Sequence, residues 1–252
     1  MKTILIIAGS DSGGGAGIQA DIKTAEYFKV FSTTAITAVT AQNSLGVEAV
    51  FDLPTDFIQK QLDAITKDFK INAVKIGMLS NKDVIDLTYE FIKDLKIPII
   101  LDPVFISKAG STLMSDENIS YLKNIFEFAT IITPNLYEAK KLFKTKPNGD
   151  CGVIAPCDTV ITNIKNGDLS IDKLYYKNGL TKEFKTKFID STNLHGTGCS
   201  FSTAIAANLA LGKNIEEAIL LAKNYIYNAI KFAPKLGNGK GPIRHNLNGF
   251  MS

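Results

Sequence analysis

The sequence predicts an α/β protein with three layers, in which helices cover both faces of one mostly parallel β-sheet. Two observations predict this fold class. Strand-like patterns alternate with helical patterns of ordinary length through the first half of the chain, which is typical of βαβ units. The first strand pattern, TILIIA at residues 3–8, is a continuous apolar run that ends in glycines, as expected of a strand buried on both faces.

The first half of the chain repeats this alternation in order. AGIQADIKTAEYFKV (16–30) has helical spacing, and TTAITAVTAQN (33–43) is β-branched and alternating, as strands are. PTDFIQKQLDAITKDF (54–69) opens with a proline, which suits the first turn of a helix. The same criteria then predict a strand at 71–79, a helix at 81–95, and strands at 97–104 and 129–135.

The second half is less regular. Residues 144–168 are rich in Gly, Pro, Asn and Asp, with one short strand at roughly 158–163. Residues 173–190 favour a hairpin, because Asn178-Gly179 is a dipeptide that suits a tight turn. Helices are expected at about 197–211 and 214–232. Because no internal repeat, low-complexity tract or linker divides the chain, we expect a single domain over residues 1–252.

Composition excludes several classes of protein. A formal net charge of +3 over 252 residues is too small to argue for a nucleic-acid partner. The N-terminal apolar run is too short for a signal sequence and no stretch approaches a membrane span, so we expect a cytoplasmic protein. The cysteines are odd in number and lack C-x-x-C spacing, so they predict neither a disulfide framework nor a zinc site. Cys151 and Cys157 are interpreted as buried or loop residues.

Polar residues and glycines follow several of the predicted strands. In an open parallel sheet, ligands gather at the carboxyl ends of the strands, so these positions form the candidate site. They are Gly9 to Gly17, Gln42, Asn43, Met78, Asp102, Asn135, Glu138 and the loop from Gly196 to Cys199.

The glycine-rich segment AGSDSGGGAG (8–17) lies where a phosphate loop would be expected. It lacks the lysine of a P-loop, and its glycines do not fit G-x-G-x-x-G. We interpret it as a glycine-lined wall that a flat ligand or a phosphate can approach closely. A flexible turn between strand and helix is the alternative. For Asp21, early in the next helix, the residues alone suggest a solvated acid.

A second glycine pair precedes a late apolar helix, in HGTGCSFSTAIAA (195–207). Backbone N–H groups at a helix N-terminus lack intrahelical acceptors, and the helix dipole favours an anion there. Such a site can stabilise the charge of a transferring phosphoryl group. The same field is expected to lower the pKa of Cys199, which makes the thiol a candidate base or nucleophile. The alternative is a tight helix cap without a ligand.

With both loops considered, the chain resembles the ribokinase-like kinases that phosphorylate vitamin precursors. Among them it is most similar to the hydroxymethylpyrimidine/phosphomethylpyrimidine kinases of thiamine biosynthesis. The resemblance rests on AGSDSGGGAGIQADIKT, TAVTAQNSLGV, VKIGMLS, LDPVFISKAGSTL, ITPNLYEA, HGTGCSFS and GNGKGPIRH. It implies a ribokinase-like three-layer α/β/α fold, a homodimer, and phosphorylation by ATP and Mg²⁺ of an aminopyrimidine alcohol and then of its monophosphate.

The resemblance also implies roles for single residues. Asp21 corresponds to an acid that contacts the hydroxymethyl group, and Gln42 to an amide that reads the ring with a donor and an acceptor on one plane. The other expected residues of the substrate pocket are Gly9, Met78 and Val104. Residues 107–113, SKAGSTL, correspond to a flap over the substrate.

The expected ATP and phosphate-transfer residues come from three later segments. Asp102, Asn135 and Glu138 are implied to lie near the ATP phosphates and Mg²⁺, with Glu138 holding the ion through water. The implied anion hole consists of Gly196, Thr197 and Gly198. Cys199 occupies the position of the catalytic Asp of related sugar kinases.

The chain departs from the family pattern in its middle third. VITNIKNGD (160–168) has Asn163 where the family usually has a lysine near the ATP phosphates, and Lys165 is a candidate replacement. The connection from Phe143 to Asp158 looks short and without a helix. Two other functions therefore stay open. One is a pyridoxal kinase, and the other is a non-catalytic protein that binds the pyrimidine or a nucleotide.

Overall fold

The computed structural model describes residues 1–105, 114–143 and 157–250. Their nine strands form one sheet with the order β3-β2-β1-β4-β5-β6-β7-β8-β9. The strands are β1 (Thr3–Asp11), β2 (Phe31–Gln42), β3 (Val47–Asp52), β4 (Ala73–Ile76), β5 (Ile99–Leu101), β6 (Ile131–Ile132), β7 (Asp158–Asn166), β8 (Leu169–Tyr175) and β9 (Thr181–Lys187). All pairs from β2 across to β7 are parallel, whereas β3, β8 and β9 pair antiparallel. The predicted mostly parallel sheet is confirmed.

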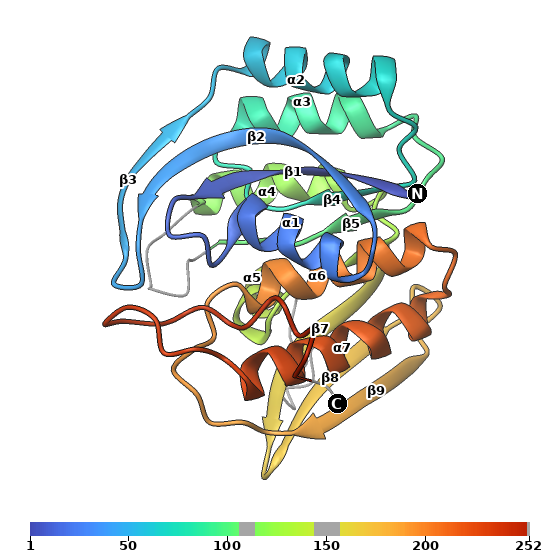
Figure 1. The fold of residues 1–252 in the computed structure, drawn as a ribbon. Coiled ribbons are helices and arrows are strands. Elements are labelled where there is room, and N and C mark those ends of the chain that lie inside the picture. The colour runs from blue at the N-terminus through green and yellow to red at the C-terminus, as the bar shows by residue number, and fades with distance from the viewer. Residues whose placement is uncertain (106–113, 144–156, 251–252) are drawn as a thin grey trace.

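Helices cover both faces of this sheet, as predicted (Figure 1). They are α1 (Gly17–Tyr27), α2 (Thr55–Asp68), α3 (Lys82–Ile92), α4 (Asp116–Leu122), α5 (Leu136–Leu142), α6 (Thr197–Ala210) and α7 (Ile215–Lys231), with a short 3₁₀ turn at Lys123–Ile125. The cores under α1, α6 and α7 and under α2, α3 and α4 lie on opposite faces of the sheet.

Strand β1 explains why both faces are buried. Ile4 and Ile6 point to the core under α1 and α6, while Leu5 and Ile7 point to the core under α2 and α3. Each of these side chains is completely buried. The period of two places successive apolar side chains on opposite faces, so a strand between two helix layers needs an unbroken apolar run.

The predicted elements are confirmed in type, with differences in extent. The segment predicted as strand 129–135 pairs only at Ile131–Ile132, and 71–79 pairs only at Ala73–Ile76. The edge strand β3 and the short helices α4 and α5 have no counterpart in the prediction. No helix in the described part of the chain is both long and apolar enough to cross a membrane.

Candidate active site

A cavity of about 600 Å³ opens at the carboxyl edge of the parallel strands. The described residues predicted for the site line this cavity, except residues 12–15, Asn43, Asp21 and Lys165. The lining residues with predicted roles are Gly9, Gln42, Met78, Asp102, Val104, Asn135, Glu138, Gly196, Thr197, Gly198 and Cys199. The structure therefore brings together residues that are almost 190 positions apart in the sequence, because the parallel strands that precede them end at one edge.

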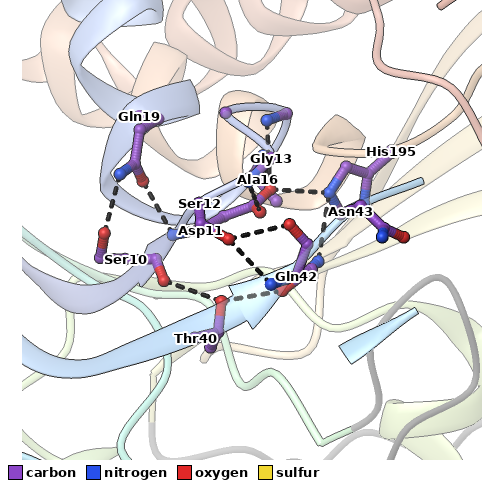
Figure 2. Close-up of polar contacts among 12 residues, drawn as sticks. Ser10, Asp11, Ser12, Gly13, Ala16, Gln19, Thr40, Gln42, Asn43 and His195 are labelled. Carbon is purple, nitrogen blue, oxygen red and sulfur yellow. Dashed lines mark hydrogen bonds and ion pairs between the residues drawn. The ribbon is translucent and has the colours of Figure 1, made fainter. Parts of the chain in front are cut away.

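The glycine loop after β1 folds around the carboxylate of Asp11 (Figure 2). The backbone N–H of Gly13 donates to Oδ1 at 2.8 Å, and those of Gly15 and Ala16 donate to Oδ2 at 3.1 and 2.8 Å. His195 Nε2 lies 2.8 Å from the same Oδ2. Although burial raises it, hydrogen bonds with His195 and this backbone lower the pKa of Asp11, so the carboxylate is ionised.

His195 connects this loop to the substrate pocket. Its Nε2 lies 3.3 Å from the side-chain Nε2 of Gln42, and the side-chain Oε1 of Gln42 accepts a hydrogen bond from the Thr40 hydroxyl at 3.2 Å (Figure 2). The amide that was predicted to read the ring is thus contacted on both of its ends. On the same cavity lining, a methyl group on Gly9 would lie 3.2 Å from the sulfur of Met78, so these two residues pack closely.

The loop before α6 packs directly on the first glycine loop. Gly196 is the N-cap of α6 and has a φ of 87°, a conformation that glycine adopts without strain. A Cβ at this position would lie 1.9 Å from the carbonyl oxygen of Gly15. Only glycine therefore allows both loops to approach. The N–H of Thr197, the first residue of α6, donates to the Leu194 carbonyl at 3.3 Å, and the next two residues, Gly198 and Cys199, line the cavity.

Cys199 lies in the first turn of α6 and also contacts α1. Gly17, the first residue of α1, lies near enough for its backbone N–H to favour negative charge on the sulfur. Burial nevertheless raises the pKa of Cys199 to about 12, against the lowering effect of Lys75 and the Gly17 N–H. The expectation of a lowered thiol pKa is wrong, because desolvation outweighs the effect of the positive end of the helix.

Three oxygen-bearing side chains face the same cavity from β5 and α5. Asp102 Oδ2 accepts a hydrogen bond from Ser202 at 3.3 Å, which ties it to α6. Asn135 and Glu138 form a capping box at the start of α5. The side-chain Oδ1 of Asn135 accepts a hydrogen bond from the backbone N–H of Glu138 at 3.0 Å, and Glu138 Oε2 accepts one from the backbone N–H of Asn135 at 2.8 Å. The side chains of Asp102 and Glu138 are each at least 95% buried, and both residues line the cavity.

Comparisons with known proteins place this geometry in a family. A family model described as phosphomethylpyrimidine kinase matches residues 11–244. The chain belongs to this family. A hydroxymethylpyrimidine/phosphomethylpyrimidine kinase of Haemophilus influenzae is 38% identical over 97% of both chains. A bifunctional thiamine biosynthesis protein ThiED of Geobacter sulfurreducens is 37% identical over 97% of this chain and 52% of its own length.

Solved structures agree with the family and identify its fold. The pyridoxal kinase of Bacillus subtilis, solved as an ADP complex, superposes with a TM-score of 0.86 at 34% identity over 97% of both chains. A phosphomethylpyrimidine kinase of Clostridium difficile superposes with a TM-score of 0.73 at 35% identity, over 91% of this chain and all of its own. The predicted ribokinase-like fold and phosphotransferase activity are confirmed.

The kinase differs from the prediction at Asp21. This residue is completely buried and does not line the cavity. Its Oδ2 lies 2.8 Å from the ammonium of Lys75, and its Oδ1 accepts a hydrogen bond from Thr203 at 2.7 Å. Asp21 points between α1, β4 and α6 because it occupies the inner face of α1 with Ile18 and Ala25. It is neither the solvated acid suggested by its position nor a residue of the cavity surface.

The structure also differs from the prediction of a lysine near the phosphates. Lys165 is exposed, its ammonium lies 4.2 Å from the ring centre of Phe188, and it does not line the cavity. Asn163 does line it, in a left-handed conformation with a φ of 56°. The lysines that line the cavity are Lys75, Lys187 and Lys223. Lys223 is buried and pairs with Asp172 at 3.0 Å, and Asp172 also accepts from the Asn163 N–H at 2.8 Å.

Some predicted features fall outside the described residues. These are the flap at 107–113, Cys151 and most of the connection from Phe143 to Asp158. Cys157 is buried, as expected. Asp11 lay within the predicted segment Gly9 to Gly17 and His195 within the HGTGC segment, but neither was given a role, and Lys75 was not predicted for the site. A signal existed for Lys75, since it is a lone charge inside the apolar strand AVKI, and for His195, since it opens the HGTGC motif.

Proposed function

We propose that this kinase transfers the γ-phosphoryl group of ATP to the hydroxymethyl group of 4-amino-5-hydroxymethyl-2-methylpyrimidine. A second transfer then phosphorylates the monophosphate, which gives the pyrimidine diphosphate used in thiamine biosynthesis. The observation that carries the proposal is the convergence of the first glycine loop, two buried acids and a helix N-terminus on one cavity. A volume of about 600 Å³ suits a small-molecule site.

The pyrimidine fits the end of the cavity beside the first glycine loop. Gly9 and Met78 provide a narrow apolar wall for a flat ring, and Val104 lies on the same lining. Gln42 offers a donor and an acceptor to the amino group and ring nitrogens. In this orientation we expect the hydroxymethyl group to point toward Cys199 and the N-terminus of α6, where it would accept the phosphoryl group.

ATP with Mg²⁺ fits the opposite end. Mg²⁺ prefers oxygen ligands and usually takes one or two carboxylates together with substrate phosphates and water. No three His, Cys, Asp or Glu side chains in the described part of the chain gather as a metal site. Asp102 and Glu138 would nevertheless supply carboxylate oxygens that suit such an ion, with Glu138 acting through water. The ion would neutralise charge on the phosphates during transfer. The ADP complex of the Bacillus subtilis relative supports a nucleotide in this cavity.

The first transfer requires a base, because an alcohol is a poor nucleophile at neutral pH. We assign this role to the thiolate of Cys199, which takes the hydroxyl proton. The alcohol oxygen then forms a bond to the γ-phosphorus, the bond to the bridging oxygen breaks, and ADP leaves with that electron pair. The N–H groups of Gly198 and Cys199 stabilise the transferring charge. In the second transfer the attacking phosphate oxygen is already ionised and needs no base.

Product analysis tests this function directly. The protein is incubated with Mg-ATP and the hydroxymethylpyrimidine, and the products are identified by mass spectrometry. Mono- and diphosphate of the pyrimidine are expected. If no phosphorylated pyrimidine forms while the ligand still raises the melting temperature, the protein is a non-catalytic binder and the proposal fails.

Pyridoxal phosphorylation is the second candidate. It is favoured by the superposition on the Bacillus subtilis pyridoxal kinase, with a TM-score of 0.86 against 0.73 for the Clostridium difficile phosphomethylpyrimidine kinase. A parallel reaction with pyridoxal separates the two, and we expect the larger kcat/KM for the pyrimidine. Magnesium, a homodimer, a single domain and a cytoplasmic location stay predictions.

A further inference from the structure

A buried ion pair lies at the wall of the cavity: Lys75 lines the cavity, and Asp21 lies behind Lys75. Lys75 on β4 and Asp21 on α1 are both completely buried, and their Nζ and Oδ2 atoms are 2.8 Å apart. Burying two charges is costly even when they pair, and hydrophobic residues of similar volume often replace such pairs without loss of stability. Stability alone therefore does not explain why a charged pair is buried at this position.

The pair is connected to Cys199 through two helices that pack side by side. On α1, the N–H of Gly17 favours negative charge on the Cys199 sulfur, and Asp21 follows four residues later. On α6, Cys199 is followed four residues later by Thr203, whose hydroxyl donates to Asp21 Oδ1 at 2.7 Å. Residues four apart lie on the same face of a helix. The ion pair thus lies one helical turn below the thiol.

Three charged groups act on the thiol from the elements around it. They are the ammonium of Lys75 on β4 and the carboxylates of Asp21 on α1 and Asp102 after β5. Lys75 lowers the pKa of Cys199, and the two carboxylates raise it. Although burial opposes it, the attraction of Asp21, Cys199 and Asp102 raises the pKa of Lys75, so the ammonium stays charged at neutral pH.

We propose that Lys75 and Asp21 are a positioning pair for Cys199, in which the buried ammonium stabilises the thiolate and the carboxylate holds the ammonium and moderates its effect. The proposal deepens the proposed function, since the thiolate is the base of the alcohol step. When the hydroxyl proton moves to sulfur, the negative charge passes from the thiolate to the attacking oxygen. Lys75 keeps its proton throughout.

The test uses substitutions that remove one charge of the pair at a time. Lys75→Met removes the positive charge, and Asp21→Asn removes the negative charge with little change of shape. The pH dependence of iodoacetamide alkylation at Cys199 is followed by peptide mass spectrometry, which separates this thiol from Cys151 and Cys157. We expect the alkylation profile to move to higher pH in Lys75→Met and to lower pH in Asp21→Asn. Each shift should be about one unit or more, or about tenfold in rate at a fixed pH.

Opposite signs are the decisive readout. A pair that only holds the fold would loosen the site in both variants and move the two profiles in one direction. Because Lys75→Met leaves a buried carboxylate unpaired and can fail to fold, Lys75→Met/Asp21→Asn supplies a variant without the pair. The alkylation profile of this double variant should lie between those of the two single variants. Asp172→Asn is a matched control, since it removes the carboxylate of the other buried Lys–Asp pair described in the structure, and the Cys199 profile should stay unchanged.

Alkylation needs no substrate, so this result is independent of the kinase reaction. If wild-type protein phosphorylates the pyrimidine but the profiles shift in the same direction or not at all, the pair is structural and the inference fails. If the shifts are opposite but no product forms, the proposed function fails, whereas the inference that the pair controls the pKa of Cys199 stands. With both intact, Asp21→Asn should also move the acid limb of alcohol phosphorylation to lower pH, with no such shift in monophosphate phosphorylation.

Discussion

The sulfur atom of Cys199 lies near the N-termini of two helices, its own α6 and α1, where the Gly17 N–H acts on it. Both helix ends favour negative charge at sulfur, whereas burial opposes this charge and has the larger effect on the pKa. The residue therefore acts as a base only if the surrounding positive charges compensate for desolvation. This balance makes the two phosphorylation steps differ in their need for the thiol.

Cys199→Ala should separate these steps. We expect alcohol phosphorylation to fall by about 100-fold or more, the lower range of a lost general base. Monophosphate phosphorylation should stay near the wild-type rate, because its nucleophile is already ionised. Initial rates with each substrate at saturating Mg-ATP measure both effects, and Cys157→Ala, away from the cavity, should change neither. Equal losses in both steps would show that Cys199 positions phosphate and does not accept a proton.

Single residues show where sequence reasoning reached the site and where it stopped. The glycines and polar groups after the strands could be placed correctly, because strand ends in a parallel sheet share an edge. Asp21 could not, since a position early in a helix does not say which face of the helix is buried. Likewise, the distance between His195 and Asp11, 184 positions apart, exists only once the two loops pack together.

Helix α6 requires a glycine at its N-cap, Gly196. Gly196→Ala would place a left-handed alanine against the Gly15 carbonyl, whereas Gly212, after the end of α6, has a φ of 88° with nothing within 4 Å of an added Cβ. We expect Gly212→Ala to lower the free energy of unfolding by about 1–2 kcal/mol, the cost of the left-handed conformation. Gly196→Ala should lose a further ~1–3 kcal/mol through the clash.

Urea unfolding of the two glycine variants measures this difference at identical backbone conformation. Gly196→Ala should also lose phosphoryl transfer, because the first N–H groups of α6 move away from the cavity, while Gly212→Ala should retain it. Similar stability losses in both variants would mean that the two loops separate easily and that the N-terminus of α6 is not held by their contact.

Element types were predictable where the apolar period was long. Helices α2 and α7 and strands β1 and β2 carry such patterns and match the prediction within a few residues. The edge strand β3 was missed because five of its six side chains are exposed, which removes the alternation that marks a strand. Helices α4 and α5 have seven residues each, too few for a clear helical period.

At the scale of the whole molecule, the C-terminal segment joins parts that the sheet alone leaves separate. Lys240 N–H donates to the Ser44 carbonyl at 2.9 Å, and the Ile243 N–H donates to the His195 carbonyl at 3.2 Å. The segment thus crosses the loop after β2 and the loop before α6. The family resemblance of GNGKGPIRH acquires a physical reason here, but strand order and this return path depend on long-range packing that no local pattern contains.

His245 fastens this segment and makes the stability of the molecule depend on pH. The hydroxyl of Tyr225 donates to its carbonyl oxygen at 3.0 Å, while its buried Nε2 has no hydrogen-bond partner among the described residues. Burial, and then the charges of Lys23 and His195, lower the pKa of His245 to about 4. The unfolded chain binds a proton near pH 6.5, so between pH 6.5 and 4 it takes up a proton that the folded state does not, and stability falls as the pH is lowered.

Replacing His245 with glutamine should remove this dependence. At pH 5 the linkage relation gives a loss of about 2 kcal/mol for the wild type relative to pH 7.5, where the histidine is neutral in both states. Urea unfolding at the two pH values should show a decrease that is smaller by about this amount in His245→Gln. All other titrating groups are shared by the two proteins, so the difference between them isolates His245. Identical decreases would mean that the imidazole is hydrated or free to leave its buried position, and that the C-terminal segment is held by its backbone contacts alone.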